Sequence, residues 1–340
     1  MTKSRSQKEK PLSSVILAKM CAPAECGRWI PVLFVLGLIG WCYGVFMADV
    51  LLPGLAASTA GAQRELAVGL IVAFNAIFAL AMLSFLRAVF TDPGRIPDSW
   101  IVYEDPRQYA AGDLEGGGGG ESGGLLAPTK VAQSTSERKH DGNVRICKKS
   151  KPNVYKPDRA HYCKVISRCV LKMDHFCPWL NNCIGFYNHK YFVLFIVYMA
   201  AECIFILVVT TPVFMMIINN MEEVTLDLHD AEFHISLTYM MVCLLALGLC
   251  AFSGFHLYLL AGNYTTIEFL EKRGCQPPPG HVNRYDLGTW RNVCAVLGDN
   301  PLVWPLPVRW TCRGDGLSFP LNPAVTGGDR GIVQYAKKPM

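Results

Sequence analysis

The sequence predicts an all-α polytopic membrane protein, with four transmembrane helices and a small cytosolic cysteine-rich domain between the second and the third. Three observations lead to this fold class. The 340-residue chain is 51% hydrophobic and only 17% charged, a composition typical of membrane proteins. Four long runs carry almost no charge, at residues 29–48, 66–86, 191–218 and 235–262. Between the second and third runs lies a basic segment, 144–190, that holds five of the 14 cysteines.

The two N-terminal runs are long enough to cross a bilayer. Trp29–Ala48 has 20 residues without a charge, and Leu66–Leu86 has 21. At about 1.5 Å per helical residue, each run covers the roughly 30 Å hydrocarbon core. Asn75 lies inside the second run, and we expect its side chain to bond to a neighbouring helix.

The two C-terminal runs each contain one residue that is unusual in a membrane span. Glu202 interrupts the third run, and an ionisable group in a span usually faces protein or water rather than lipid. We therefore expect Glu202 to be structural or to line a cavity. His256 lies in the fourth run, where we expect it to be a hydrogen-bonded packing residue.

The distribution of charge orients the four spans. Residues 144–190 include ten Lys or Arg and two acidic residues, whereas residues 219–234 include five acidic residues and no Lys or Arg. By the positive-inside rule, the first segment is cytosolic and the second is lumenal or extracellular. Both termini are then cytosolic, with the protein in an endomembrane (ER/Golgi) or the plasma membrane. Thiols that face the cytosol are expected to be reduced.

This topology predicts six segments. The Gly-rich stretch GGGGGESGG at 116–124 is too flexible to bury a core, so it marks a linker. The segments are a cytosolic N-terminal segment (1–28), transmembrane helices 1 and 2 (29–90), the Gly-rich cytosolic linker (91–143), the cysteine-rich domain (144–190), transmembrane helices 3 and 4 (191–262) and a cytosolic C-terminal tail (263–340).

Within the cysteine-rich domain, Asp174, His175 and Cys177 have the residue types of a nucleophilic site. A thiolate is the reactive form of cysteine, and a neighbouring imidazole can take the thiol proton. A carboxylate beside the imidazole fixes its tautomer and stabilises the imidazolium. This reading requires a backbone sharply folded enough to bring the three together, and Pro178 disfavours a helix there. The alternative is that Cys177 is one more zinc ligand and His175 a surface histidine.

The stretch VLKMDHFCPWLNNCIGFYNHKYF, which begins at Val170, resembles the core of the DHHC-type protein S-acyltransferases, the palmitoyltransferases. Three further motifs are similar to motifs of that family and stand in the same order. They are Asp92-Pro93-Gly94 after the second run, Thr265-Thr266-Ile267-Glu268 after the fourth run, and the Asn-containing segment Asn283-Arg284-Tyr285-Asp286-Leu287-Gly288. The resemblance covers roughly Trp29 to Gly288.

The resemblance implies a two-step acyl transfer. Cys177 would attack the thioester of a long-chain acyl-CoA such as palmitoyl-CoA, with His175 as general base and Asp174 orienting it. The acyl group would then pass to a membrane-proximal cysteine of a cytosolic-facing substrate protein. Thr265, Thr266, Glu268 and Asn283 would support the site. The lipid bilayer is the other expected partner, and no nucleic-acid partner is expected.

The basic residues of the cysteine-rich domain are a plausible binding place for coenzyme A, which is a phosphate-rich anion. Contact with lipid headgroups, or simple solvation, explains the same charges equally well. The candidates are Arg145, Lys148, Lys149, Lys164, Arg168 and Lys172.

The chain departs from the family in its metal ligands. The family motif is Asp-His-His-Cys, but Phe176 stands at the third position. The family holds two zinc ions, each by three Cys and one His, and here the resemblance implies only two surviving ligands at each site. Cys147, Ser150, Tyr162 and Cys169 stand at the first site, and Cys163, Ile166, Phe176 and Cys183 at the second.

Two alternatives follow, because structural zinc is almost always four-coordinate. His161, or a shifted pairing among Cys147, Cys163, Cys169 and Cys183, builds one composite zinc site. Alternatively, Tyr162, Ile166 and Phe176 pack as a small apolar core in place of zinc.

The leading functional prediction is a protein-cysteine S-palmitoyltransferase that works through an acyl-Cys177 intermediate. The alternative is a catalytically impaired member of the family that acts as a membrane scaffold, because zinc ligands are missing. A channel or transporter is disfavoured, because the four runs have no internal repeat or broken-helix pattern.

Overall fold

A computed structural model describes residues 27–58, 61–97, 100, 135–138, 142–150, 153–220, 230–274, 283–308 and 314–326. The chain divides into two compact units. The helical unit comprises residues 1–91, 177–182 and 191–255, and the hairpin unit comprises residues 92–176, 183–190 and 256–340. The predictions for the N-terminal segment before Gly27, for most of the Gly-rich linker and for the acidic loop at 221–229 lie outside the described residues.

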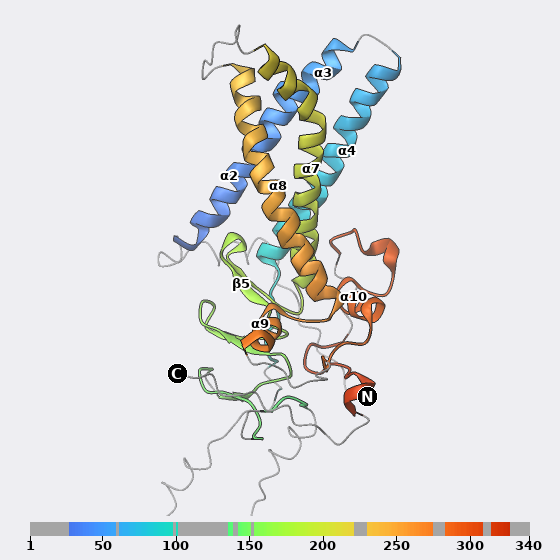
Figure 1. The fold of residues 1–340 in the computed structure, drawn as a ribbon. Coiled ribbons are helices and arrows are strands. Elements are labelled where there is room, and N and C mark those ends of the chain that lie inside the picture. Colours follow the sequence, from blue (N-terminus) through green and yellow to red (C-terminus); the bar gives the residue numbers. More distant parts are fainter. Residues whose placement is uncertain are drawn as a thin grey trace, which may run out of the picture. The chain divides into compact units, whose positions relative to one another are not determined.

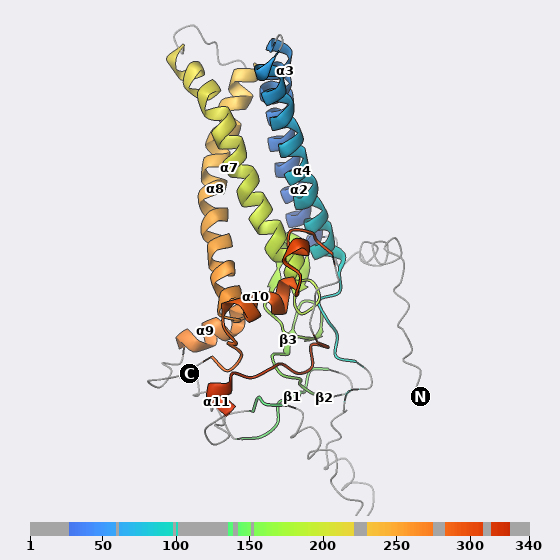
Figure 2. The same ribbon diagram turned by 90° about the vertical axis from the view of Figure 1, so that its right-hand side faces the viewer.

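Four helices are long and apolar enough to cross a membrane, which confirms the predicted number of spans. The first runs over Gly27–Ala57 and consists of α2 (Ile30–Val45), the π-helical turn η2 (Phe46–Leu51) and α3 (Leu52–Ala57). The other three are α4 (Ala62–Phe90), α7 (His189–Asn219) and α8 (Ala231–Ala261). Within the helical unit they run side by side, as both ribbon views show (Figure 1, Figure 2).

The first helix continues past the predicted end at Ala48. Asp49 lies inside η2, and Pro53 occupies the first turn of α3. Proline lacks a backbone donor, and here it directly follows the π-helical turn, where the regular α-helical hydrogen-bond pattern is already interrupted. Arg64 and Glu65, expected in the connecting loop, begin α4 instead. A single charge near a helix end is therefore a poor marker of where the helix stops.

Aromatic and small apolar side chains from all four helices form the core of the helical unit. Phe46, Phe74, Cys203 and Val242 are buried in one cluster, and the ring centroids of Phe46 and Phe74 are 4.7 Å apart. Tyr43 Oη donates a 2.9 Å hydrogen bond to Asn75 Oδ1 and so joins α2 to α4. The predicted interhelical role of Asn75 is confirmed.

The cysteine-rich segment folds as three short two-stranded sheets, a feature that the all-α prediction missed. β1 (Ile146–Cys147) pairs with β2 (Val154–Tyr155), and β3 (His161–Cys163) pairs with β4 (Arg168–Val170), both antiparallel. β5 (His175–Cys177) pairs with β6 (Asn182–Ile184). The short helices α9 (Thr266–Gly274), α10 (Thr289–Leu297), η4 (Pro301–Val303) and α11 (Pro323–Thr326) follow α8.

The turn between β5 and β6 belongs to the helical unit. It contains a 3₁₀ turn, η3 (Pro178–Leu180), and Asn181 in the left-handed region at φ 45°. The side-chain amide of Asn182 donates to the carbonyl oxygens of Ala88, Val89 and Thr91, at 2.9–3.1 Å. These carbonyls lie at the C-terminal end of α4, where no helical amide remains to bind them. Asn182 therefore fastens the turn that carries Cys177 to a membrane helix.

We expect the substitution Tyr43→Phe to lower the free energy of unfolding by about 1 kcal/mol, because Asn75 Oδ1 loses its interhelical donor. Thermal unfolding in detergent micelles measures the change. Tyr258→Phe is the matched control, because Tyr258 is 62% exposed on α8. Equal effects of the two substitutions would contradict a specific role for the Tyr43–Asn75 bond.

Candidate active site

The side chain of Asp174 is almost fully buried and accepts three hydrogen bonds. His175 Nδ1 lies 2.7 Å from Asp174 Oδ2, which also accepts from Thr266 Oγ1 at 2.7 Å. The backbone amide of Thr266 donates to Asp174 Oδ1 at 2.8 Å. Burial alone would raise the Asp174 pKa, but the His175 hydrogen bond, the charges of His189 and His175, and the Thr266 amide together hold that pKa well below its usual range. Asp174 is therefore a carboxylate at neutral pH.

This carboxylate fixes the tautomer of the His175 ring. With Nδ1 facing the carboxylate, the neutral ring carries its proton on Nδ1, and Nε2 keeps a lone pair that can accept a proton. The His175 side chain is 24% exposed, and its ring centroid lies 5.9 Å from that of His256. His256 is buried against the His175 ring, which agrees with the predicted packing role, while its predicted hydrogen bond stays a prediction. The Asp174–His175 pair has the arrangement of an oriented general base.

Cys177 ends strand β5, two residues after His175. Successive side chains of a strand point to opposite faces, so residues two apart share a face. The backbone through His175 and Cys177 is extended, and the requirement that the two side chains come together stays a prediction. Pro178 ends the strand and begins η3, in agreement with the prediction that no helix runs through this point.

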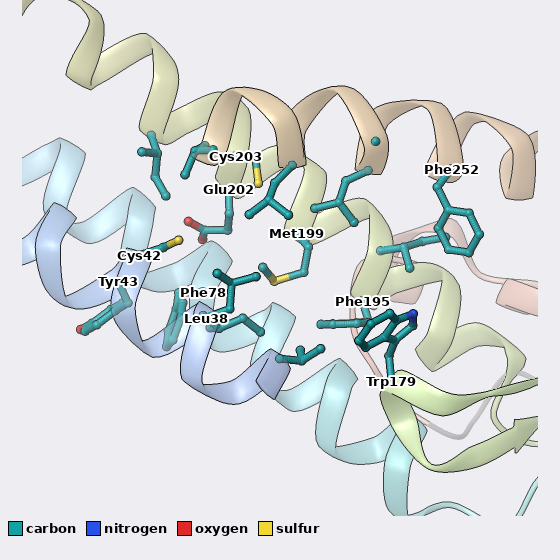
Figure 3. Close-up of a pocket in the computed structure, with 18 of the residues that line it drawn as sticks. Leu38, Cys42, Tyr43, Phe78, Trp179, Phe195, Met199, Glu202, Cys203 and Phe252 are labelled. Atoms are coloured by element: carbon teal, nitrogen blue, oxygen red, sulfur yellow. The ribbon is translucent and has the colours of Figure 1, made fainter. Parts of the chain in front are cut away.

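The Cys177 side chain lines a cavity inside the helical unit. The cavity has a volume of about 470 Å³, and its walls come from α2, α4, α7, α8 and the β5–β6 turn. Most wall residues are apolar, among them Leu38, Phe78, Phe195 and Met199 (Figure 3). Cys177 itself is only 7% exposed. The cavity is suited to a long hydrocarbon chain attached at this thiol.

The predicted support motif Thr265-Thr266-Ile267-Glu268 caps helix α9. Thr265 Oγ1 accepts from the backbone amide of Glu268, and Glu268 Oε2 accepts from the backbone amide of Thr265 at 2.9 Å. This reciprocal pair is a capping box. It fixes the first turn of α9 and with it Thr266, which holds Asp174.

Arg159 is a support residue that the sequence analysis missed. It is 1% exposed, and both its Nε and its Nη2 donate to Glu268 at 2.7 Å. The same guanidinium donates to Asn263 and lies over the Tyr285 ring, 4.4 Å from its centroid. A single arginine in a basic segment gives no sequence signal for this role, because its partners follow more than 100 positions later.

The Asn-containing segment completes the end of helix α8. Asn283 Nδ2 donates to the Gly262 carbonyl at 2.6 Å, and Asn292 Nδ2 donates to the Ala261 carbonyl at 2.7 Å. Asn263 in turn donates to the Tyr285 carbonyl at 2.7 Å. The roles of Asn263 and Asn292 were not predicted, although asparagine side chains beside a helix end often donate hydrogen bonds to its last carbonyls.

The predicted remnants of the first metal site lie together, but as a pair of thiols. Cys147 and Cys169 share a hydrogen bond and are buried in one apolar cluster, against which Tyr162 packs. Ser150 Oγ donates to the Cys147 carbonyl at 2.9 Å. Two thiols with a tyrosine and a serine do not form the four-coordinate ligand set of structural zinc.

The second predicted metal site is likewise a pair of thiols packed among apolar side chains. The thiols of Cys163 and Cys183 share a hydrogen bond, which lowers the pKa of Cys163 to about 6. Ile166 and Phe176 pack against these two cysteines in a second apolar cluster. Cys183 Sγ also donates to the His175 carbonyl at 3.2 Å. Apolar side chains thus take the positions of the missing ligands beside strand β5.

The composite zinc site predicted as an alternative is not seen among the residues that the structure describes. The four cysteines divide between the two clusters, and within the described part of the chain no three potential ligands come together. His161 pairs with Val170 across β3 and β4. Burial and the charges of Arg145, Lys156 and Arg159 lower its pKa to about 3, and the same cations disfavour a metal ion. The alternative of an apolar core in place of zinc agrees better with the structure, because Ile166 and Phe176 pack in one apolar cluster. Tyr162, however, packs in the cluster of Cys147 and Cys169.

The basic candidates for coenzyme A differ in their availability. Arg145 forms an ion pair with Glu137, and Arg168 pairs with Asp92 at 2.7 Å. Lys172 is 3% exposed and lies over the Phe319 ring. Lys148, Lys149 and Lys164 are exposed. The side chains best placed to meet an anion from solution are therefore these three lysines.

Comparison with known proteins gives consistent matches. A family model described as DHHC palmitoyltransferase matches residues 141–273. Palmitoyltransferase ZDHHC2 of Homo sapiens is 31% identical over 308 residues, which cover 88% of this chain and 78% of the relative. Probable protein S-acyltransferase 14 of Arabidopsis thaliana is 32% identical over 316 residues, covering 90% and 94%. Palmitoyltransferase ZDHHC15A of Danio rerio is 32% identical over 311 residues, covering 88% and 87%.

We expect Thr266→Val to destabilise the protein at pH 7 by about 1–3 kcal/mol, because a buried carboxylate loses a hydrogen bond. The stabilisation by Asp174 is fully present above its unfolded pKa of about 3.9 and is lost as the pH falls toward its lower folded pKa. The difference between wild type and variant should therefore shrink below about pH 4. Thermal unfolding across pH measures it, with the exposed Thr289→Val as control. A difference independent of pH would contradict the role of Asp174.

We expect chelators to leave the melting temperature of the purified protein unchanged, because apolar packing fills the positions of two ligands at the second site. The double substitution Ile166→Cys with Phe176→His restores three Cys and one His there. This variant should bind one zinc per chain, detected by mass spectrometry of the metal content, and should lose stability on chelation. Val165→Cys with Phe176→His is the control with a displaced thiol. A chelator-sensitive wild type would contradict the prediction.

Proposed function

Because the chain belongs to the DHHC palmitoyltransferase family, we propose that it is a protein-cysteine S-palmitoyltransferase that uses Cys177 as its nucleophile. The observation that carries this proposal is the 2.7 Å contact between the buried Asp174 carboxylate and His175, which stands two residues before a thiol that lines an apolar cavity. The four long helices make it an integral membrane enzyme. Its donor is a long-chain acyl-CoA.

The first step forms the acyl-enzyme. His175 Nε2 takes the proton of the Cys177 thiol while Asp174 stabilises the resulting imidazolium. The Cys177 sulfur forms a bond to the thioester carbonyl carbon, and the bond from that carbon to the sulfur of coenzyme A breaks. The leaving thiolate takes the proton from His175. The acyl group is then held on Cys177 by a thioester of the same kind as the one broken.

The second step repeats this chemistry with another thiol. A cysteine of the substrate protein gives its proton to His175 and attacks the acyl carbonyl, and Cys177 leaves and recovers a proton. Because thioester and thiol appear on both sides of each step, one base serves both. The apolar cavity holds the acyl chain throughout, at about 0.8 kcal/mol per buried methylene.

The hairpin unit and both termini face the cytosol in this proposal, in an endomembrane (ER/Golgi) or the plasma membrane. The supporting observation is the contrast between the basic segment 144–190 and the acidic loop 219–234. Substrates are proteins with membrane-proximal cysteines on the cytosolic side. The exposed Lys148, Lys149 and Lys164 supply positive charge for the phosphates of coenzyme A. The scaffold alternative is not favoured, because Asp174 and His175 form an ordered pair despite the altered metal ligands.

We expect purified wild-type protein to incorporate an alkyne analogue of palmitate from its CoA thioester in a hydroxylamine-sensitive linkage. Cys177→Ser should incorporate none, because it lacks the nucleophile, and His175→Ala should be slowed by about 10²–10⁴-fold. Labelling is read by click chemistry and gel fluorescence. Cys250→Ser is the matched control, because Cys250 is an exposed thiol of α8, and it should label like the wild type. Undiminished labelling of Cys177→Ser would place the acyl group elsewhere.

A further inference from the structure

Glu202 is the one acidic side chain among the described residues that line the cavity, and no lysine, arginine or histidine lines it. Glu202 is 3% exposed, and neither of its carboxyl oxygens has a hydrogen-bond partner in the described part of the chain. Figure 3 shows the carboxyl group pointing from α7 toward Cys42, at the opposite end of the drawn cavity from Trp179. The sequence prediction that Glu202 lines a cavity is confirmed.

An orphan carboxyl group in an apolar wall needs an explanation, because nearly all buried polar groups are hydrogen-bonded. The nearby wall supplies no strong partner. The hydroxyl of Tyr43 is already committed to Asn75, and Cys42 and Cys203 offer thiols, which are weak donors and acceptors. A carboxyl oxygen accepts a hydrogen bond in either protonation state, and the protonated group also donates one. We therefore expect a molecule bound in the cavity to supply the hydrogen-bond partner of the Glu202 carboxyl.

The position of Glu202 along α7 indicates which part of an occupant it meets. Phe192 lines the cavity ten residues before Glu202, which corresponds to about 15 Å along the helix axis. Trp179 follows Cys177 by two residues, and Figure 3 shows Trp179 at the end of the lining opposite to Glu202. An acyl chain bound to Cys177 therefore reaches Glu202 with its distal methylenes rather than with its carbonyl end.

We propose that Glu202 recognises a hydroxyl group on the distal part of the acyl chain, so that the cavity prefers ω-hydroxylated long-chain acyl groups to unsubstituted ones. This inference rests on the proposed acyltransferase function and specifies its donor. A site built to hydrogen-bond a hydroxyl disfavours the analogue that lacks it, because the buried polar group is then left unpaired. An unsubstituted acyl chain leaves the Glu202 carboxyl without a hydrogen-bond partner.

The test measures binding without turnover. In the Cys177→Ser background, dissociation constants are determined for ω-hydroxypalmitoyl-CoA and palmitoyl-CoA. We expect the hydroxylated ligand to bind about tenfold more tightly, the gain of one buried hydrogen bond. Adding Glu202→Met should reduce the preference to about one, whereas Glu202→Gln, which can still hydrogen-bond, should retain most of it. Equal dissociation constants for the two ligands in the protein that retains Glu202 would overturn the proposal. So would a preference for the hydroxylated ligand that is unchanged in Glu202→Met.

Two controls locate the effect at Glu202. α-Hydroxypalmitoyl-CoA carries its hydroxyl beside the thioester, and it should show no gain over palmitoyl-CoA. Leu245→Met alters an apolar wall residue of the same cavity and should leave the preference intact. An equal gain from the α-hydroxyl would also overturn the proposal. Failure of the enzyme assignment is recognised separately, by the absence of palmitate labelling on wild-type protein, because the binding ratio does not depend on acyl transfer.

Discussion

The buried carboxylate of Asp174 is the group on which the rest of the hairpin unit depends. A carboxylate removed from water is tolerated only when hydrogen bonds replace its hydration, and here His175 and Thr266 supply three of them. Thr266 is fixed by the capping box of α9, whose Glu268 is in turn held by Arg159. A motif about 90 residues downstream in the sequence thus holds the carboxylate that pairs with the His175 imidazole.

Packing occupies the positions where the family resemblance implied metal ligands. Ile166 and Phe176 cover Cys163 and Cys183, and Tyr162 covers Cys147 and Cys169. A metal ion holds a loop through a few directional bonds, whereas an apolar cluster holds it through many weak contacts whose strength grows with buried area. The substitution at Phe176 therefore changes how β5 is held, while Asp174 and His175 beside it keep their hydrogen bond.

The sequence predicted the four spans and the interhelical role of Asn75, because each has a local signature. The motif residues around Asp174 were expected from the resemblance to a known family. Long apolar runs locate spans, and adjacent Asp, His and Cys indicate nucleophilic chemistry. The role of Arg159 was not predictable, because its partners Glu268 and Asn263 follow more than 100 positions later. The grouping of Cys147 with Cys169 and of Cys163 with Cys183 agrees with the two predicted sites, but their packing as thiol pairs was not predicted. Helix ends were missed where one charge, Asp49, was taken to end a span.

The position of Cys177 on the cavity wall bears on the lifetime of an acyl intermediate. A thioester persists until a second thiol arrives only if water is kept from its carbonyl carbon. Cys177 is 7% exposed, and the cavity beside it is lined mostly by aromatic and aliphatic side chains, which offer water few hydrogen-bond partners. Because Asn182 ties the turn that presents Cys177 to the last carbonyls of α4, this shielding is built into the helix end itself. The same apolar wall makes the lone carboxyl of Glu202 consequential, because the wall offers that carboxyl no strong hydrogen-bond partner.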